Sequence, residues 1–246
     1  MAVSQLAKTV FFISDLHLGL ESPEKELKKE LLFVKFLKFS QNKISDLYIL
    51  GDLFDYWFEY KRVFQKGYFR TFNALAELVD AGTNVHYIIG NHDFLHVDFF
   101  EKHVGVKLYL DPVEIDINGK KFYMGHGDGL VKNDLGYKIL KKILRNRLAQ
   151  RLYSMIHPDL GIKIASSSSK KSRDYTKQKD YGESDGLFET AKTKIDQGFD
   201  YVLFGHSHNL AEKKYKNGYY INLGTWLSKP YYGKFKDGKF DIIEWK

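Results

Sequence analysis

Cysteine is absent from all 246 residues. This absence excludes a disulfide-bonded scaffold, thiolate metal ligands and a cysteine nucleophile. Long hydrophobic runs are also missing, since stretches such as residues 10–13 are far shorter than the roughly 20 apolar residues that span a bilayer. The N-terminal region lacks the long apolar segment of a secretory signal. We therefore expect a soluble, cytoplasmic protein.

Acidic residues are scarce in one part of the chain. The formal net charge is +7, but residues 130–173 contain 11 Lys or Arg and only two acids, Asp134 and Asp159. That segment therefore carries +9, and the remaining residues sum to −2. A local basic segment suggests an anionic partner, such as nucleic acid, a phospholipid surface or a phosphorylated substrate. A solvated helix face is the alternative interpretation.

Short apolar runs alternate with helical patterns in the first half of the chain. Residues 9–14, 46–50 and 85–89 are predicted strands, and each ends at polar residues. Between them the apolar spacing predicts one helix that starts near Pro23 and another over residues 64–81. This alternation is typical of an α/β fold, in which ligands bind at the carboxyl ends of the strands.

The second half contains more predicted strands. Asn118-Gly119 and Asp237-Gly238 are two-residue turn signals, and apolar runs flank both of them, which predicts two hairpins. Residues 201–204 and 219–222 are further predicted strands. We expect a two-sheet core flanked by helices, in a single domain over residues 1–246 with a helical insertion over residues 130–185.

Five short motifs follow predicted strands, at residues 15–17, 51–55, 90–93, 125–128 and 205–208. Each contains Asp, Asn or His, which supply oxygen and imidazole metal ligands, and four of them contain glycine, which permits tight turns. Two residues at Asp-x-His or His-x-His spacing can point at one ion. Five such motifs predict a dinuclear metal site. Asp55 and Asp93 are placed either to orient imidazoles or to cap turns.

The set and order of these motifs resembles the calcineurin-like metallophosphoesterase superfamily. The resemblance implies a four-layer αββα sandwich, an α/β fold in which two mixed sheets pack face to face with helices outside. It implies two divalent metal ions, with the carboxylate of Asp52 bridging them and His92 beside the bridging solvent, so that Asp52 and His92 are the expected catalytic residues. Manganese is expected because mixed imidazole, carboxylate and amide ligation suits it. The implied metal ligands are Asp15, His17, Asp52, Asn91, His126, His206 and His208.

Within the basic segment, leucines recur at helical spacing over residues 136–156, and Lys and Arg fill much of the remaining surface. An amphipathic basic helix of this kind is typical of a surface that meets an anionic membrane or an acyl-bearing ligand. The alternative is an ordinary helix that packs its apolar stripe on the core.

Residues 126–137, 150–152, 164–165 and Ser172, together with 51–57, resemble the UDP-2,3-diacylglucosamine pyrophosphatases of lipid A biosynthesis and their helical lid. That resemblance implies hydrolysis to UMP and 2,3-diacylglucosamine 1-phosphate by a peripheral protein on the cytoplasmic face of the inner membrane. The proteobacterial enzymes carry Arg where this chain has His92 and Asn where it has Thr176. The implied substrate-binding residues are Asn91, His92, Asp134, Ser172, Thr176, Lys179 and His206.

Two other functions are compatible with the same motifs. One is a different metallophosphoesterase, such as a soluble nucleotide-sugar pyrophosphatase or phosphodiesterase. The other is a non-catalytic module whose basic helix docks on membrane or nucleic acid. Nucleic acid is the less favoured partner, because the basic stretch has few interleaved aromatic residues.

Overall fold

The computed structural model describes residues 8–60, 62–63, 65–130, 142–143, 146–161, 163 and 183–246. Its first sheet has six strands in the order β11-β10-β1-β2-β3-β4. The strands β1 to β4 are parallel to one another. At the β1 edge, β10 pairs antiparallel with β1, and β11 pairs antiparallel with β10. The bounds are β1 Val10–Ile13, β2 Asp46–Ile49, β3 Asn84–Ile88, β4 Lys107–Tyr109, β10 Tyr231–Lys236 and β11 Lys239–Glu244.

The second sheet has five strands in the order β5-β6-β7-β9-β8. The central strands β6, β7 and β9 are parallel, whereas β5 and β8 pair antiparallel at the two edges. Both sheets are therefore mixed, as predicted. The bounds are β5 Val113–Ile117, β6 Lys120–Met124, β7 Tyr201–Phe204, β8 Leu210–Tyr215 and β9 Gly218–Leu223.

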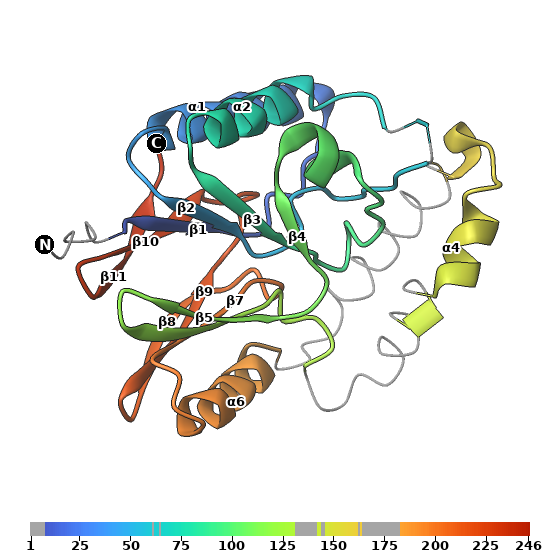
Figure 1. Cartoon of the computed structure of the whole chain (residues 1–246). Helices are drawn as coiled ribbons and strands as arrows, with labels where there is room; N and C mark the ends of the chain where they lie inside the picture. Colours follow the sequence, from blue (N-terminus) through green and yellow to red (C-terminus); the bar gives the residue numbers. More distant parts are fainter. Residues whose placement is uncertain are drawn as a thin grey trace, which may run out of the picture.

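Helices cover the outer face of each sheet (Figure 1). The helices α1 (Pro23–Ser40) and α2 (Phe69–Asp80) lie side by side over the first sheet, and α6 (Glu183–Asp196) lies over the second. Three buried apolar clusters separate these layers: one under α1 and α2, one between the sheets, and one under α6. Phe12 belongs to the middle cluster, where its ring stacks on Phe122 of the other sheet at 5.8 Å. The predicted four-layer sandwich is thus confirmed.

Local backbone conformation explains where the sequence prediction was right and where it was wrong. The hairpins at Asn118-Gly119 and Asp237-Gly238 are confirmed, and all four residues have positive φ as a type I′ turn requires. The helix predicted over residues 64–81 begins only at Phe69, because the preceding Tyr68 has a left-handed backbone. The sequence did not predict the short strand β4, the edge strand β8, the helix α6 or the π-helical turn Phe100–Val104.

Part of the basic helix predicted over residues 136–156 is described as α4 (Arg147–Tyr153). Its N-cap residue Asn146 accepts hydrogen bonds from the backbone N–H groups of Leu148 and Ala149, which begins the helix. The Tyr153 hydroxyl lies 3.1 Å from that of Tyr56, so α4 contacts the body of the protein. Within the described ranges, no helix is both long and apolar enough to span a bilayer.

Candidate metal centre

The five sequence motifs lie in loops that follow β1, β2, β3, β6 and β7. The first three strands are neighbours in one parallel array, and β6 and β7 are neighbours in the other. Carboxyl ends of adjacent parallel strands share one edge of a sheet. Because the two sheets pack face to face, the loops from both edges meet, and they bring residues as distant in sequence as Asp15 and His206 into contact.

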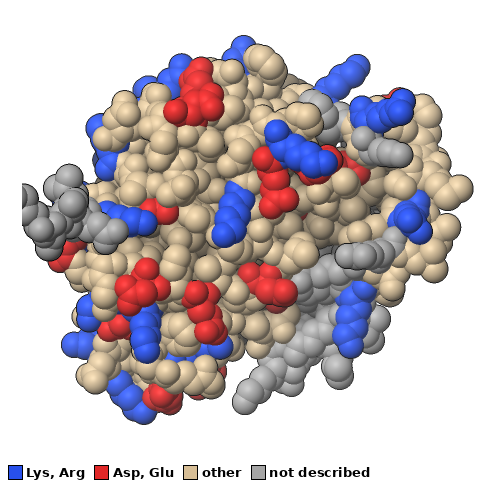
Figure 2. All heavy atoms as spheres, viewed as in Figure 1, with Lys and Arg blue, Asp and Glu red and all other residues tan. Residues whose placement is uncertain are grey.

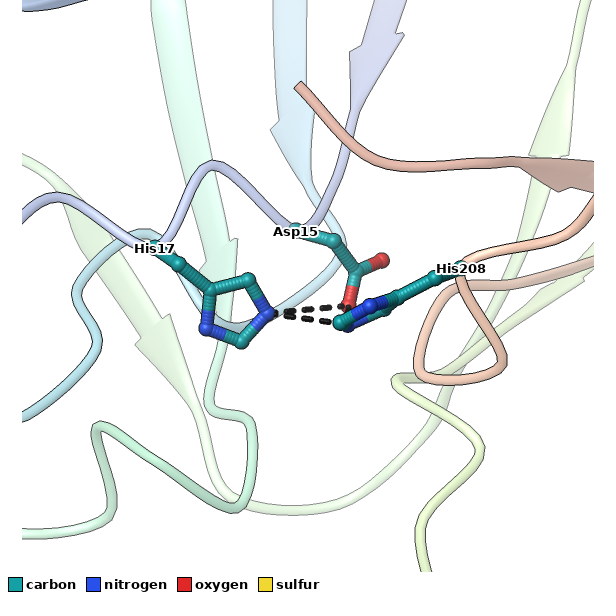
Figure 3. Close-up of side chains that lie close together, drawn as sticks. All are labelled: Asp15, His17 and His208. Atoms are coloured by element: carbon teal, nitrogen blue, oxygen red, sulfur yellow. Dashed lines mark hydrogen bonds and ion pairs between the residues drawn. The ribbon is translucent and has the colours of Figure 1, made fainter. Parts of the chain in front are cut away.

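The first donor group consists of Asp15, His17 and His208 (Figure 3). The Nε2 atoms of His17 and His208 face one another at 3.0 Å. One carboxylate oxygen of Asp15 lies 3.4 Å from His208 Nε2 and 3.8 Å from His17 Nε2. Asp15 and His17 are buried. Two imidazole nitrogens and a carboxylate oxygen therefore converge on one point, which suits a divalent cation.

The second donor group consists of Asn91, His126 and His206. The side-chain oxygen of Asn91 lies 2.8 Å from His126 Nε2 and 2.9 Å from His206 Nδ1. An amide oxygen and two imidazole nitrogens are again donors that a divalent cation accepts. The two histidines come from the second sheet and the asparagine from the first, so this group also depends on how the sheets pack.

Asp52 lies between the two donor groups. Its Oδ2 atom is 3.2 Å from His126 Nε2 in the second group and 3.7 Å from His17 Nε2 in the first. The other oxygen, Oδ1, accepts a hydrogen bond of 2.9 Å from the backbone N–H of His92. One carboxylate oxygen is thus near donors of both groups while the second is held by the loop after β3.

Most of the donor residues have an uncommon backbone conformation. A positive φ costs a non-glycine residue about 1 kcal/mol or more, and such residues cluster at functional sites. Asp and His accept this conformation better than most residue types. Five of the predicted ligands have φ between 48° and 66°, namely Asp15, His17, Asp52, His206 and His208.

Two motif glycines leave the space that the carboxylates occupy. A β-carbon at Gly90 would overlap Asp52 Oδ1, and one at Gly205 would lie 2.5 Å from Asp15 Oδ2. Neither glycine has a positive φ. They are required for close approach and not for a turn, because the loop of Gly90 admits the carboxylate that follows the neighbouring strand β2, and the loop of Gly205 admits the carboxylate that follows β1 of the other sheet.

Backbone carbonyls orient two of the imidazoles. His126 Nδ1 lies 2.9 Å from the carbonyl oxygen of Leu50, and His92 Nδ1 lies 3.0 Å from that of Asp55. Each ring therefore donates from Nδ1 and turns Nε2 toward other partners. The Asp55 carboxylate is 3.6 Å from His92 Nδ1 and 3.7 Å from His17 Nδ1, so it is placed to orient both rings.

Asp93 has the turn-capping role that was one of its two predicted alternatives. Its carboxylate accepts hydrogen bonds from the backbone N–H groups of Gly90 and Leu53 and from the hydroxyl of Tyr87. Burial, together with the charge of Asp52, raises the pKa of Asp93 to about 6. Asp93 therefore braces the loops after β2 and β3 against each other.

Charges among the buried donors determine which of them carry protons. Burial alone would raise the pKa of Asp52, but the neighbouring His126 and His92 hold it well below its ordinary value. Burial lowers the pKa of His126, yet the Asp52 carboxylate outweighs this and raises it well above its ordinary value. Burial and the charge of His126 lower the pKa of His206 to about 4. In the metal-free protein, His126 is thus protonated at neutral pH and His206 is not.

In the first donor group, too, the pKa of one histidine is lowered and that of the other is raised. Burial lowers the pKa of His17 below its ordinary value. Burial also opposes the protonation of His208, but its contact with the Asp15 carboxylate raises its pKa. Each donor group therefore combines one imidazole whose pKa is lowered with one whose pKa is raised by a neighbouring carboxylate.

All seven predicted metal ligands, together with His92, lie within this centre. Asp55 lies between His17 and His92, so its carboxylate is placed for the first of its two predicted roles, the orientation of imidazoles. Asp134, Ser172, Thr176 and Lys179, predicted to bind substrate, lie outside the described residues. Lys29, whose ammonium group contacts the His17 loop, was not predicted, because a lysine within an amphipathic helix carries no signal in a single sequence.

Comparison with known proteins matches residues 8–210 to the family described as calcineurin-like phosphoesterase. Several curated relatives carry the name UDP-2,3-diacylglucosamine hydrolase. The relative from Porphyromonas gingivalis is 29% identical over 96% of both chains. The one from Haemophilus ducreyi is 30% identical and covers 89% of this chain and 92% of its own. A third, from Pseudomonas aeruginosa, is 33% identical over 83% of both chains.

Metal binding to this centre should release protons. Imidazoles bind a divalent ion only when neutral, so His126 and His208 must lose the protons that their raised pKa values retain. We expect the affinity for Mn²⁺ to increase as the pH rises above the ordinary histidine pKa of 6.5, with a net release of protons on binding. Calorimetric titration in buffers of different ionisation enthalpy measures this release. An affinity that is independent of pH, with no proton released, would contradict the assigned protonation states.

Proposed function

The chain belongs to the calcineurin-like phosphoesterase family, and on that premise we propose that it hydrolyses the pyrophosphate bond of UDP-2,3-diacylglucosamine. The products are UMP and 2,3-diacylglucosamine 1-phosphate. The observation that carries the proposal is the likeness, over most of the chain, to relatives named for this substrate. The converging donors of the candidate metal centre support it, because they supply what a metal-dependent hydrolase requires.

Family membership implies a divalent metal cofactor, and the donor set fits one. We assign one ion to Asp15, His17, Asp52 and His208 and a second to Asp52, Asn91, His126 and His206. Mn²⁺ is the proposed ion because mixed imidazole, carboxylate and amide donors suit it. When bound, such an ion pair lowers the pKa of a water held between the ions and stabilises both the attacking and the leaving oxygen.

The chain's own residues orient the reacting groups. The Asp52 carboxylate, fixed through Oδ1 by the His92 N–H, keeps Oδ2 in reach of both donor groups. The His92 ring donates from Nδ1 to the Asp55 carbonyl, which leaves Nε2 as the atom that exchanges a proton with substrate. A protonated Nε2 would stabilise charge on a phosphoryl oxygen or protonate the leaving group.

A cavity beside α4 supports a large substrate. It has a volume of about 760 Å³, within the range of ligand sites, and lies between α4 and the segments 58–59 and 95–98. Phe58, Leu95 and Leu148 give it apolar walls, and Arg151 adds a positive charge. Glu59 and Asp98 also line the cavity, so its charge is mixed, and its apolar walls are the feature that suits the acyl chains of such a substrate. We propose that residues 130–185 form a lid inserted into one domain over 1–246, and that Asp134, Ser172, Thr176 and Lys179 contact substrate together with Asn91, His92 and His206.

The apolar side chains that α4 exposes support a location at a membrane, and one of them, Leu148, also lines the cavity. Leu148 and Leu152 are 65% and 59% exposed, and Met155, just beyond the helix, is 81% exposed. Arg151 lies in the last turn of the same helix. At this end of the molecule Figure 2 shows scattered Lys and Arg side chains on an otherwise uncharged described surface, whereas acidic and basic side chains intermix over the sheets. We propose a cytoplasmic protein that binds peripherally to the anionic face of the inner membrane through this helix.

Purified protein with Mn²⁺ should release UMP from UDP-2,3-diacylglucosamine. His126→Ala removes a donor of the second group, and we expect its rate to fall by more than the 10–100-fold typical of residues that only support metal ligands. His103→Ala, at an exposed position, is the matched control and should keep the parent rate. Chromatographic quantification of UMP measures both. Rapid cleavage of a simple phosphodiester without UMP release would instead favour a different metallophosphoesterase.

Loss of the exposed leucines of α4 should weaken membrane binding. Leu148→Ser/Leu152→Ser removes apolar area worth up to about 1.5–3 kcal/mol per side chain, so we expect at least about a tenfold lower partition into phosphatidylglycerol vesicles. Leu110→Ser/Leu210→Ser is the matched control, because these leucines are 61% and 46% exposed on other elements. Co-sedimentation with vesicles measures the partition. Equal binding by the two double variants would rule out α4 as the membrane contact.

A further inference from the structure

Lys29 is a buried lysine in α1, with only 6% of its surface exposed. Its ammonium group donates a hydrogen bond of 2.8 Å to the backbone carbonyl oxygen of His17. Burying an ammonium is costly unless its charge and its donors are satisfied. The position of Lys29 under the loop that carries His17 therefore needs explanation.

Two glutamates balance the charge of Lys29. Glu26 Oε2 lies 3.3 Å and Glu21 Oε2 3.5 Å from the Lys29 ammonium nitrogen. The ammonium thus has one hydrogen-bond acceptor, the His17 carbonyl, and two carboxylates as ion-pair partners. Because the carboxylates neutralise it, the ammonium can support the loop without adding net positive charge next to a cation site.

The loop at His17 needs support on both sides of that residue. His17 has φ of 48°, in the left-handed region. On its amino side, its N–H donates 3.0 Å to the carbonyl of Asp52. On its carboxyl side, the peptide that joins it to Leu18 donates 2.9 Å through the Leu18 N–H to the carbonyl of Leu53. The His17 oxygen of that peptide accepts 3.3 Å from the N–H of Leu20 and, at the shorter distance of 2.8 Å, from Lys29. The next peptide oxygen, that of Leu18, accepts a hydrogen bond of 3.3 Å from the hydroxyl of Tyr68.

We propose that Lys29 is a positioning residue of the metal centre, which fixes the strained backbone of His17 so that its ring faces the other donors. The His17 ring lies close to two sets of side chains among the described residues. One set is Asp15 and His208 of the first donor group, and the other is Asp55 and His92. Rotation of the peptide after His17 would therefore change the position of its ring relative to Asp15 and His208 and also relative to Asp55 and His92. The inference rests on the metal centre of the proposed function and is independent of the lipid substrate.

Lys29→Met removes the charge and the donor but keeps a side chain of similar length. We expect it to weaken Mn²⁺ binding by about 10–100-fold, as is usual for residues that orient metal ligands. Lys28→Met is the matched control on the same helix, because Lys28 is exposed and pairs only with Glu24 among the ion pairs of the described residues. It should bind Mn²⁺ as the parent protein does. Calorimetric titration with Mn²⁺ alone gives these affinities, so a failure to release UMP would not affect the result.

A second variant addresses the risk that Lys29→Met does not fold. Lys29→Met/Glu26→Gln also removes one of the carboxylates that would otherwise be left without the ammonium, and it should show the same loss of Mn²⁺ affinity. Circular dichroism and the denaturation midpoint identify which variants are folded. The proposal is overturned if either variant is folded and binds Mn²⁺ with the affinity of the parent and of Lys28→Met.

Discussion

The position of the Asp52 carboxylate depends on the packing of two sheets, and the rest of the centre depends on that position. Asp52 leaves the first sheet after β2, but its Oδ2 atom is closest to His126, which leaves the second sheet after β6. The aromatic layer between the sheets, in which Phe12 stacks on Phe122, sets the spacing at which these loops meet. A change in that spacing would separate the donors within each group, since each group contains residues from both sheets.

Convergence of this kind imposes a cost on the backbone. The backbone is left-handed at Asp15, His17 and Asp52. This uncommon conformation directs their side chains toward the other donors, which an extended strand end would not do. The surrounding structure stabilises these conformations through backbone hydrogen bonds between loops, through Asp93 and through Lys29. The glycines at 90 and 205 serve the same end, because they give the carboxylates room to approach. The centre is therefore preorganised by parts of the chain that do not themselves offer donors.

The sequence predicts an element correctly where a short motif contains the residue types that the local backbone conformation needs. The turns at Asn118-Gly119 and Asp237-Gly238 need positive φ, and the residues that tolerate it are present. The donor motifs could be found because Asp, Asn and His follow recognisable strands. The edge strand β8 could not be predicted, because none of its side chains is fully buried and every second one is exposed. Lys213 and Lys214 therefore interrupt the alternation of apolar and polar residues by which a strand is recognised. Lys29 could not be found either, since its role arises only when α1 packs under the His17 loop.

We propose that one carboxylate, that of Asp52, is shared by two metal ions. Anomalous diffraction from crystals soaked in Mn²⁺ and recorded at the manganese edge tests it directly. We expect two anomalous peaks about 3.5–4 Å apart on either side of Asp52, one beside His17 and His208 and the other beside His126 and His206. A single peak, or two peaks of which neither contacts Asp52, would contradict it.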